Sequence, residues 1–360
     1  MSIGRVRPTI TSLPAYRPGK AAEQAEQEHN IDNAIKLASN ENPFPPHPAV
    51  VEAITNAAAT VNRYPDHLAL SLRAKIGAWV GVDAEAVTVG TGSVGLLRQL
   101  AMVYIDPGDE AVYPWISFEA YPIAVTTMGG VSVQVPLDGS QFDLNAVGAA
   151  VTDRTKMIFL ATPNNPTGTA VTTTEIGDLV REIPDDVIVV VDEAYREFVD
   201  PSYGDPVQDL LPHHPNVVVL RTFSKAYGLA GLRSGYMVAH PDVIVDVDKT
   251  LLPFTNNQAA QAAAIAAIDV ADAYQPRVQE IRQERGRMVA ALAEMGVEVP
   301  DAQANFVWIP LGDATDDIYL NVEKQGVVTR PFSGVGMRVT IGTTDENDRF
   351  LKAFAAAVNA

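Results

Sequence analysis

The chain contains no cysteine among its 360 residues. This absence excludes disulfide bonds, thiolate catalysis and cysteine-ligated metals, and we expect no bound metal. Long apolar runs are absent too, since none reaches the about 18–20 residues that a membrane-spanning helix requires. The first residues, Met-Ser-Ile-Gly-Arg, lack the apolar core of a signal peptide. We therefore expect a cytoplasmic protein without a membrane partner.

Positive charge is scarce relative to negative charge. The 26 Lys and Arg residues face 44 Asp and Glu residues, which gives a formal net charge of -18. A surface this acidic repels nucleic acid and anionic lipid, so we expect neither as a partner. An anionic cofactor or substrate would need local cationic groups, which makes individual arginines informative.

Hydrophobic residues make up 47% of the chain, enough for a large core in one or two domains. Residues 1–45 are rich in proline, asparagine and charge, with no long periodic segment apart from a polar stretch near Ala21–Asn33. We interpret them as an arm that other surfaces must order, joining the small domain near the site. Residues 46–252 are predicted to form a large domain and residues 253–360 a small one.

Short β-branched runs recur along residues 46–252, and several are apolar throughout, as strands buried on both faces should be. Helical patterns such as Val94–Val103 and Thr174–Arg181 lie between them. The alternation predicts an α/β fold with a parallel sheet covered by helices on both sides. The runs are Ala86–Val89, Val131–Val135, Met157–Leu160, Val187–Val191, Val217–Leu220 and Gly235–Val238.

The pattern changes after about Leu252. Gln258–Ala271 is rich in alanine and Pro276–Met295 is charged and amphipathic, and both are predicted to be helices. Three shorter strand candidates and a final helix complete a smaller α+β unit. They are Asn305–Ile309, Gly326–Arg330 and Gly336–Ile341, followed by the helix Glu346–Val358.

Charged side chains follow two of the predicted strands, at the edge where open α/β sheets bind their ligands. Asp192 closes the apolar run Val187–Val191, where a carboxylate is costly to bury unless it is paired. It could cap the next helix, or pair with a buried cation or a protonated ring nitrogen. Lys225 follows Val217–Leu220 among small and apolar residues. It could extend to the surface, or desolvation could lower its pKa and give the neutral amine of Schiff-base chemistry.

Groups suited to an anionic, ring-containing ligand lie at the same edge. Free N–H groups at a helix start bind anions, and serine and arginine are common phosphate donors, although glycine-rich turns are frequent without any ligand. Asn165 lies in a string that makes a good turn, and its amide can also hydrogen-bond a ring oxygen. The phosphate candidates are Gly92, Ser93, Val94, Ser224 and Arg233.

The chain resembles the fold-type I aminotransferases, which use pyridoxal 5′-phosphate, in the strings Asn-Asn-Pro-Thr-Gly (164–168), Asp-Glu-Ala-Tyr (192–195) and Ser-Lys-Ala-Tyr-Gly-Leu-Ala-Gly-Leu-Arg (224–233). It is most similar to the histidinol-phosphate aminotransferase branch, through Leu-Ala-Ser-Asn-Glu-Asn-Pro (37–43) and Met-Arg-Val-Thr-Ile-Gly (337–342). Within that branch it resembles the aromatic amino acid aminotransferases of actinobacteria, through residues 61–66, 115–121 and 303–308. The resemblance implies a mainly parallel seven-stranded sheet in the large domain.

The resemblance also implies how the cofactor is held. Lys225 would carry it as a Schiff base and move the proton at the substrate's Cα, while Asp192 would pair with the pyridine nitrogen. Asn165 and Tyr195 would hydrogen-bond the ring oxygen, and Phe118 would stack on the ring. The phosphate would be bound by Gly92, Ser93, Val94, Ser224 and Arg233.

Further matching residues imply a substrate site and a partner. Arg338 resembles the arginine that receives the anionic end of the substrate, although a strand arginine could instead pair at the surface. Tyr16 and Asn42, on the arm, would close over the substrate beside Asn165. Tyr64 resembles a tyrosine that reaches the cofactor phosphate of the neighbouring subunit, which implies a homodimer.

Taken together, the resemblance implies transamination between an aromatic amino acid and a 2-oxo acid such as 2-oxoglutarate. An alternative amino donor is L-histidinol phosphate, and a more distant alternative is the decarboxylation of phosphothreonine on the same scaffold. A non-catalytic protein of this fold is disfavoured, because function resides in the site residues and these are present. They are Lys225, Asp192, Asn165, Tyr195 and Arg233.

Overall fold

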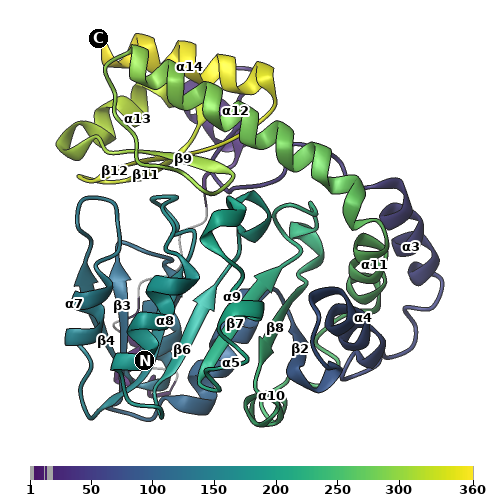
Figure 1. The fold of residues 1–360 in the computed structure, drawn as a ribbon. Coiled ribbons are helices and arrows are strands. Elements are labelled where there is room, and N and C mark those ends of the chain that lie inside the picture. Colours follow the sequence, from purple (N-terminus) through teal and green to yellow (C-terminus); the bar gives the residue numbers. More distant parts are fainter. Residues whose placement is uncertain (1–3, 12, 14–18, 360) are drawn as a thin grey trace.

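The computed structural model describes residues 4–11, 13 and 19–359, and its centre is a seven-stranded sheet (Figure 1). The strand order is β2–β8–β7–β6–β5–β3–β4, and within this sheet only β8 runs against its neighbours. The predicted α/β class with a mainly parallel seven-stranded sheet is therefore confirmed. The strands are β2 (Val87–Gly90), β3 (Glu110–Trp115), β4 (Val131–Pro136), β5 (Thr155–Ala161), β6 (Ile188–Asp192), β7 (Val217–Thr222) and β8 (Gly235–Ala239).

Successive residues of the central strands alternate between two cores. In β6, Val189 and Val191 belong to the core on one face of the sheet, whereas Val190 packs on the other. Each buried valine contributes about 1.5–3 kcal/mol, so an apolar strand suits a sheet covered on both faces. The first face is covered by α7 (Leu144–Ala149) and α8 (Thr173–Glu182), and the second by α5 (Ser93–Tyr104), α6 (Ala120–Met128) and α10 (Pro241–Asp248).

The β-branched runs predict six of these strands and miss β3. This strand begins with a carboxylate and contains Pro114, and both features are unusual inside a sheet. Glu110 is nevertheless buried, because the Thr152 hydroxyl and the Arg154 guanidinium donate hydrogen bonds to its carboxylate. Hydrogen bonds from residues outside β3 thus allow a strand to form where the sequence lacks the usual apolar pattern.

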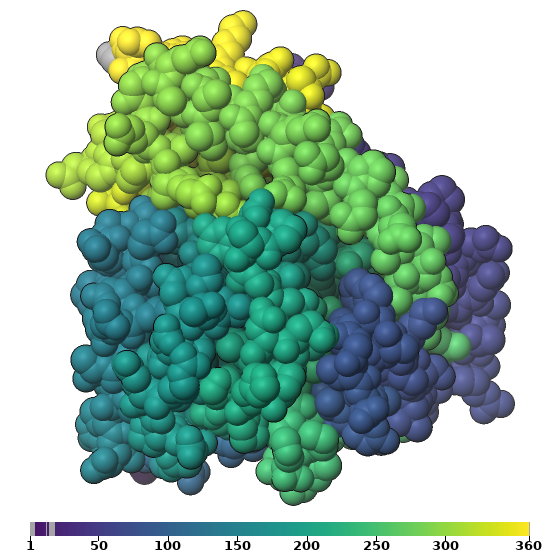
Figure 2. All heavy atoms as spheres, in the orientation of Figure 1, coloured from purple at the N-terminus to yellow at the C-terminus, as the bar shows by residue number. Residues whose placement is uncertain are grey.

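Most of the elements after α11 (Gln258–Asp269) build a second, smaller group at one end of the molecule (Figures 1 and 2). An antiparallel sheet of order β11–β12–β9 packs there with three helices. The predicted helices are confirmed to within a few residues, as are the first and third strand candidates. The elements are β9 (Phe306–Ile309), β11 (Arg330–Phe332), β12 (Gly336–Thr340), α12 (Gln275–Glu294), α13 (Thr315–Glu323) and α14 (Thr344–Val358).

The single strand predicted over Gly326–Arg330 is wrong. The chain forms β10 (Val327–Val328) and then, after Thr329, enters β11 in a different sheet. The strand β10 pairs in parallel with β1 (Ile35–Lys36), which belongs to the arm. The arm therefore supplies the partner of β10, which local periodicity cannot reveal.

The helix α11 (Gln258–Asp269) packs against α3 (Pro48–Ala58) and α4 (Leu70–Val80), beside the large sheet (Figure 1). From that side α12 extends to β9.

The domain boundaries at residues 45 and 252 stay a prediction. In the part of the chain that the structure describes, no helix has the length and apolar character needed to cross a membrane. Further helices are α1 (Pro8–Thr11), α2 (Ala22–His29) and α9 (Pro206–Asp209).

Candidate active site

A cavity of about 510 Å³ lies at the carboxyl ends of β5, β6 and β7, between the large sheet and the C-terminal elements. Residues from the arm, the large sheet and the small antiparallel sheet line it together. Most of the predicted site residues are among the lining residues. These are Ser93, Val94, Phe118, Asn165, Asp192, Tyr195, Ser224, Lys225, Arg233 and Arg338.

Lys225 follows β7 and points its amine into this cavity. Its Nζ donates a hydrogen bond to the Ser39 carbonyl over 3.3 Å and lies 5.6 Å from the centre of the Tyr195 ring. Desolvation by the surrounding protein, followed by the positive charge of Arg338, lowers the pKa of Lys225 to about 7. A large share of the amine is therefore neutral near pH 7, the form that attacks a carbonyl carbon.

Asp192 ends β6 at the same edge and is 5% exposed. The Tyr121 hydroxyl donates to its Oδ2 over 3.1 Å, but its Oδ1 has no hydrogen-bond partner among the described residues. Burial raises the pKa of Asp192 to about 6, although the hydrogen bond from Tyr121 opposes the rise. A buried carboxylate oxygen without a partner is costly. It fits a ligand with a protonated ring nitrogen.

The start of α5 forms a cradle for an anion. Gly92 has φ +75°, and no side chain caps the helix that follows it. A Cβ built on Gly92 would lie 2.6 Å from Nη2 of Arg233, so the absence of a side chain lets the guanidinium approach the helix start. Ser93 and Ser224 line the cavity beside it. Backbone N–H groups, hydroxyls and a guanidinium are the donors that bind a phosphate.

Arg338, on β12, crosses from the small antiparallel sheet to the large one. It is 8% exposed, donates to Oδ1 of Asn165, and donates to the Ala38 carbonyl over 2.6 Å. Its guanidinium lies 5.5 Å from the centre of the Phe306 ring. The predicted surface alternative for Arg338 is therefore wrong, because the side chain is buried at the cavity wall.

Three predicted residues that the structure describes are not among the lining residues, and they are Gly92, whose backbone is described above, Asn42 and Tyr64. Asn42 donates a hydrogen bond from Nδ2 to the Lys225 carbonyl over 3.0 Å. This bond anchors the loop that carries the lysine, and Asn42 is not part of the cavity lining. Tyr64 is 80% exposed and stacks on Phe254 at 4.3 Å between ring centres. Tyr16 lies outside the described residues.

Some cavity residues were not expected from the sequence. Asn40 donates from Nδ2 to the Tyr195 hydroxyl over 2.8 Å, and its position within the string 37–43 was a usable signal. Tyr121, which donates to Asp192 but is not among the lining residues, ends the string 115–121 and could have been found in the same way. Glu119 and Arg330 also line the cavity, and their pairing depends on tertiary structure alone.

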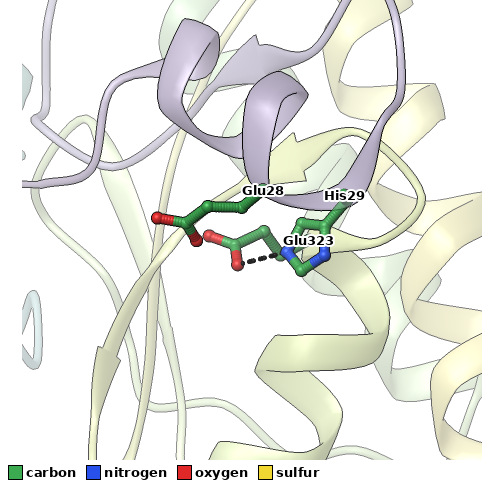
Figure 3. A group of neighbouring side chains, drawn as sticks. All are labelled: Glu28, His29 and Glu323. Atoms are coloured by element: carbon green, nitrogen blue, oxygen red, sulfur yellow. Dashed lines mark hydrogen bonds and ion pairs between the residues drawn. The ribbon is translucent and has the colours of Figure 1, made fainter.

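One group of side chains in the described ranges has the spacing of a metal site. Glu28, His29 and Glu323 converge, and His29 Nε2 lies 2.9 Å from Glu323 Oε2 (Figure 3). The Lys20 ammonium lies 2.6 Å from Glu28 and 2.9 Å from Glu323, so the negative charge is already compensated. Burial alone would raise the pKa of Glu323, but hydrogen bonds from His29, Tyr319 and Lys20 outweigh it and lower that pKa. The group therefore fastens α2 of the arm to α13.

Comparison with known proteins gives one family. Residues 32–354 match the family described as aminotransferase class I and II. The aromatic amino acid aminotransferase of Thermobifida fusca is 48% identical over 347 residues, which cover 96% of this chain and 95% of that protein. The protein of the same name from Streptomyces coelicolor is 48% identical over 350 residues, which cover 97% and 96%.

A solved structure also resembles this fold closely. The histidinol-phosphate aminotransferase of Sinorhizobium meliloti, in complex with pyridoxal-5′-phosphate, aligns with a TM-score of 0.91 and 29% identity. The alignment covers 99% of this chain and 98% of that chain. The fold-type I class implied by the sequence strings is thereby confirmed.

The cradle can be tested at Gly92. We expect Gly92→Ala to weaken pyridoxal phosphate binding by about tenfold or more. The alanine would have to adopt a left-handed φ, and its Cβ would displace the Arg233 guanidinium. Titration of cofactor-free protein, followed by absorbance, gives the Kd. The control is Gly108→Ala, where φ is +97° but open space surrounds the Cβ. An equal loss of affinity in both variants would exclude a specific role for Gly92.

The lowered pKa of Lys225 predicts how it reacts with an aldehyde. When cofactor-free protein is mixed with pyridoxal phosphate, the rate of Schiff-base formation should rise as pH increases through about 7, because only the neutral amine attacks. Borohydride reduction and peptide mass spectrometry should then place the label on Lys225 and not on the exposed Lys249. A rate that rises only near pH 10, as for an exposed lysine, would contradict this assignment.

Proposed function

This chain belongs to the class I and II aminotransferases, and we propose that it transfers the amino group of an aromatic amino acid to a 2-oxo acid, with pyridoxal phosphate as cofactor. The observation that carries the proposal is the convergence on one cavity of a buried lysine with a lowered pKa, an unpartnered buried carboxylate oxygen and an uncapped helix start. The names of relatives 45–48% identical over nearly the whole chain support the aromatic donor.

The residues present fit this cofactor in each of its parts. Asp192 Oδ1 would accept a hydrogen bond from the ring nitrogen, and the start of α5 with Ser224 and Arg233 would bind the phosphate. Tyr195 and Asn165 would donate to the ring oxygen, and Phe118 would pack against the ring. When bound, pyridoxal phosphate supplies the electron sink that makes the Cα proton of an amino acid removable.

The protein's own groups then hold and move the proton. Lys225, whose pKa burial lowers to about 7, would in its neutral form accept the proton from the substrate Cα and return it to C4′ of the cofactor. Asp192, with a pKa of about 6, is mainly ionised above neutral pH and so keeps its ring partner protonated. Arg338 would bind the substrate carboxylate at the wall formed by β12, where Phe306 and Asn165 fix its guanidinium.

The alternative donor is L-histidinol phosphate. It is favoured by the close structural likeness to the histidinol-phosphate aminotransferase of Sinorhizobium meliloti. The aromatic donor is favoured by higher sequence identity and by the apolar side of the cavity, which Phe118, Ile123 and Phe332 line.

An absorbance experiment tests the proposed reaction. Phenylalanine should shift the cofactor band from about 420 nm toward about 330 nm, and 2-oxoglutarate should restore it, because the amino group passes to the cofactor and back. Lys225→Ala should show no such cycle. The values of kcat/KM for phenylalanine and L-histidinol phosphate then decide the donor. A strong preference for the phosphate would overturn the aromatic assignment, and release of CO2 would overturn transamination itself.

We further propose that the chain acts as a homodimer, in which Tyr64 reaches the cofactor phosphate of the partner's site. The support is that Tyr64 lies outside its own cavity and is exposed with Phe254 and Leu252, an apolar group that a second subunit would cover. Sedimentation velocity should give about twice the 38.5 kDa mass of one chain. A monomer that is fully active would contradict the proposal.

A cytoplasmic location also stays a prediction.

A further inference from the structure

An ion pair in the cavity lining joins elements far apart in sequence. Arg330, in β11, donates from Nη2 to Oε2 of Glu119 over 2.7 Å, and Glu119 immediately precedes α6. The side chains are 14% and 38% exposed, and both line the cavity. The Arg330 guanidinium also lies 5.6 Å from the centre of the Phe332 ring. The pair therefore stands beside the apolar side of the cavity.

The charges that line the cavity divide into those near the cofactor groups and those beyond them. Lys225, Asp192 and Arg233 are the groups assigned above to the cofactor. Among the described residues, the other cationic groups lining the cavity are Arg98, Arg330 and Arg338, and the other anionic ones are Glu41 and Glu119. Glu41 pairs with Lys36 at 3.0 Å, whereas Glu119 compensates an arginine of the cavity itself.

We propose that Glu119 is a specificity-determining residue, which favours a donor with a single carboxylate over a donor with a phosphate. This inference rests on the proposed function and names the anion class of its substrate. A carboxylate carries one negative charge, whereas a phosphate monoester carries close to two above neutral pH. Any anion that approached Arg330 would also approach the Glu119 carboxylate, and the repulsion grows with the charge of the anion.

The arrangement combines an attractive and a repulsive element. Arg338 remains at the β12 wall for a carboxylate, whereas Glu119 neutralises Arg330 and places a carboxylate where an anion would approach that arginine. Specificity of this kind depends on the difference between two affinities, so a repulsive group can set it without contributing to the binding of the favoured ligand. The aromatic ring of such a donor would lie against Ile123 and Phe332.

Two probes that differ in their anion test the inference. The probes are 3-phenylpropionate and 2-phenylethyl phosphate, and calorimetry measures their Kd for the pyridoxal-phosphate form of the protein at about pH 8. We expect wild type to favour the carboxylate, and Glu119→Gln to shift the ratio of the two Kd values toward the phosphate by about tenfold. The shift should shrink at high ionic strength, because it is electrostatic. Glu119→Asp, which keeps the charge, should retain most of the wild-type preference.

The matched control is Glu182→Gln, which removes one charge from the exposed end of α8 and should leave the ratio unchanged. Thermal unfolding and the cofactor absorbance band check that each variant is folded and loaded. An unchanged ratio in a folded Glu119→Gln protein would overturn the inference, as would an equal shift in Glu182→Gln. Failure of wild type to transaminate phenylalanine would overturn the proposed function instead, and the binding ratio is read without turnover.

Discussion

The burial of the Asp192 carboxylate is the constraint around which the site is arranged. The strand β6 is apolar up to this residue and runs through the middle of the sheet, so its end places a charged group deep in the protein. Within the described part of the chain, Tyr121 satisfies one oxygen and nothing satisfies the other. The free-energy cost of that oxygen is removed when a ligand donates to it. In the proposed function, the desolvation penalty of Asp192 would become part of the affinity for pyridoxal phosphate.

The amino-acid sequence is sufficient to predict features that depend on local pattern and strand direction. Strand ends in a parallel sheet meet at one edge, so the positions of Asp192 and Lys225 after two apolar runs already predict that they lie together. Features that depend on distant partners are not accessible in this way. Glu110 lies inside β3 because Thr152 and Arg154 satisfy its carboxylate, and no property of the segment itself indicates that.

The same distinction applies within the site. Lys225 and Arg233 belong to one string, and the roles proposed for them follow from it. Glu119 and Arg330 are separated by most of the chain, and only the packing of β11 near α6 brings them together. Tyr64 shows the opposite case, because a residue implied to serve a site lies exposed on the single chain. Its exposure fits the proposed homodimer, in which a second subunit would cover it.

The pairing of β1 with β10 has a consequence for how the molecule is made. Ile35 lies beside Val327, and Lys20 of the arm meets Glu323, so these arm residues find partners close to the other end of the chain. Contacts with such sequence separation form late, since a long loop must close before they contribute. On the ribosome, the large sheet can be complete while the arm still lacks the surface of β10 and α13. The wall of the cavity that holds Ser39 and Asn40 is then finished only after the last elements have been made, and capture of the cofactor by the complete site follows synthesis.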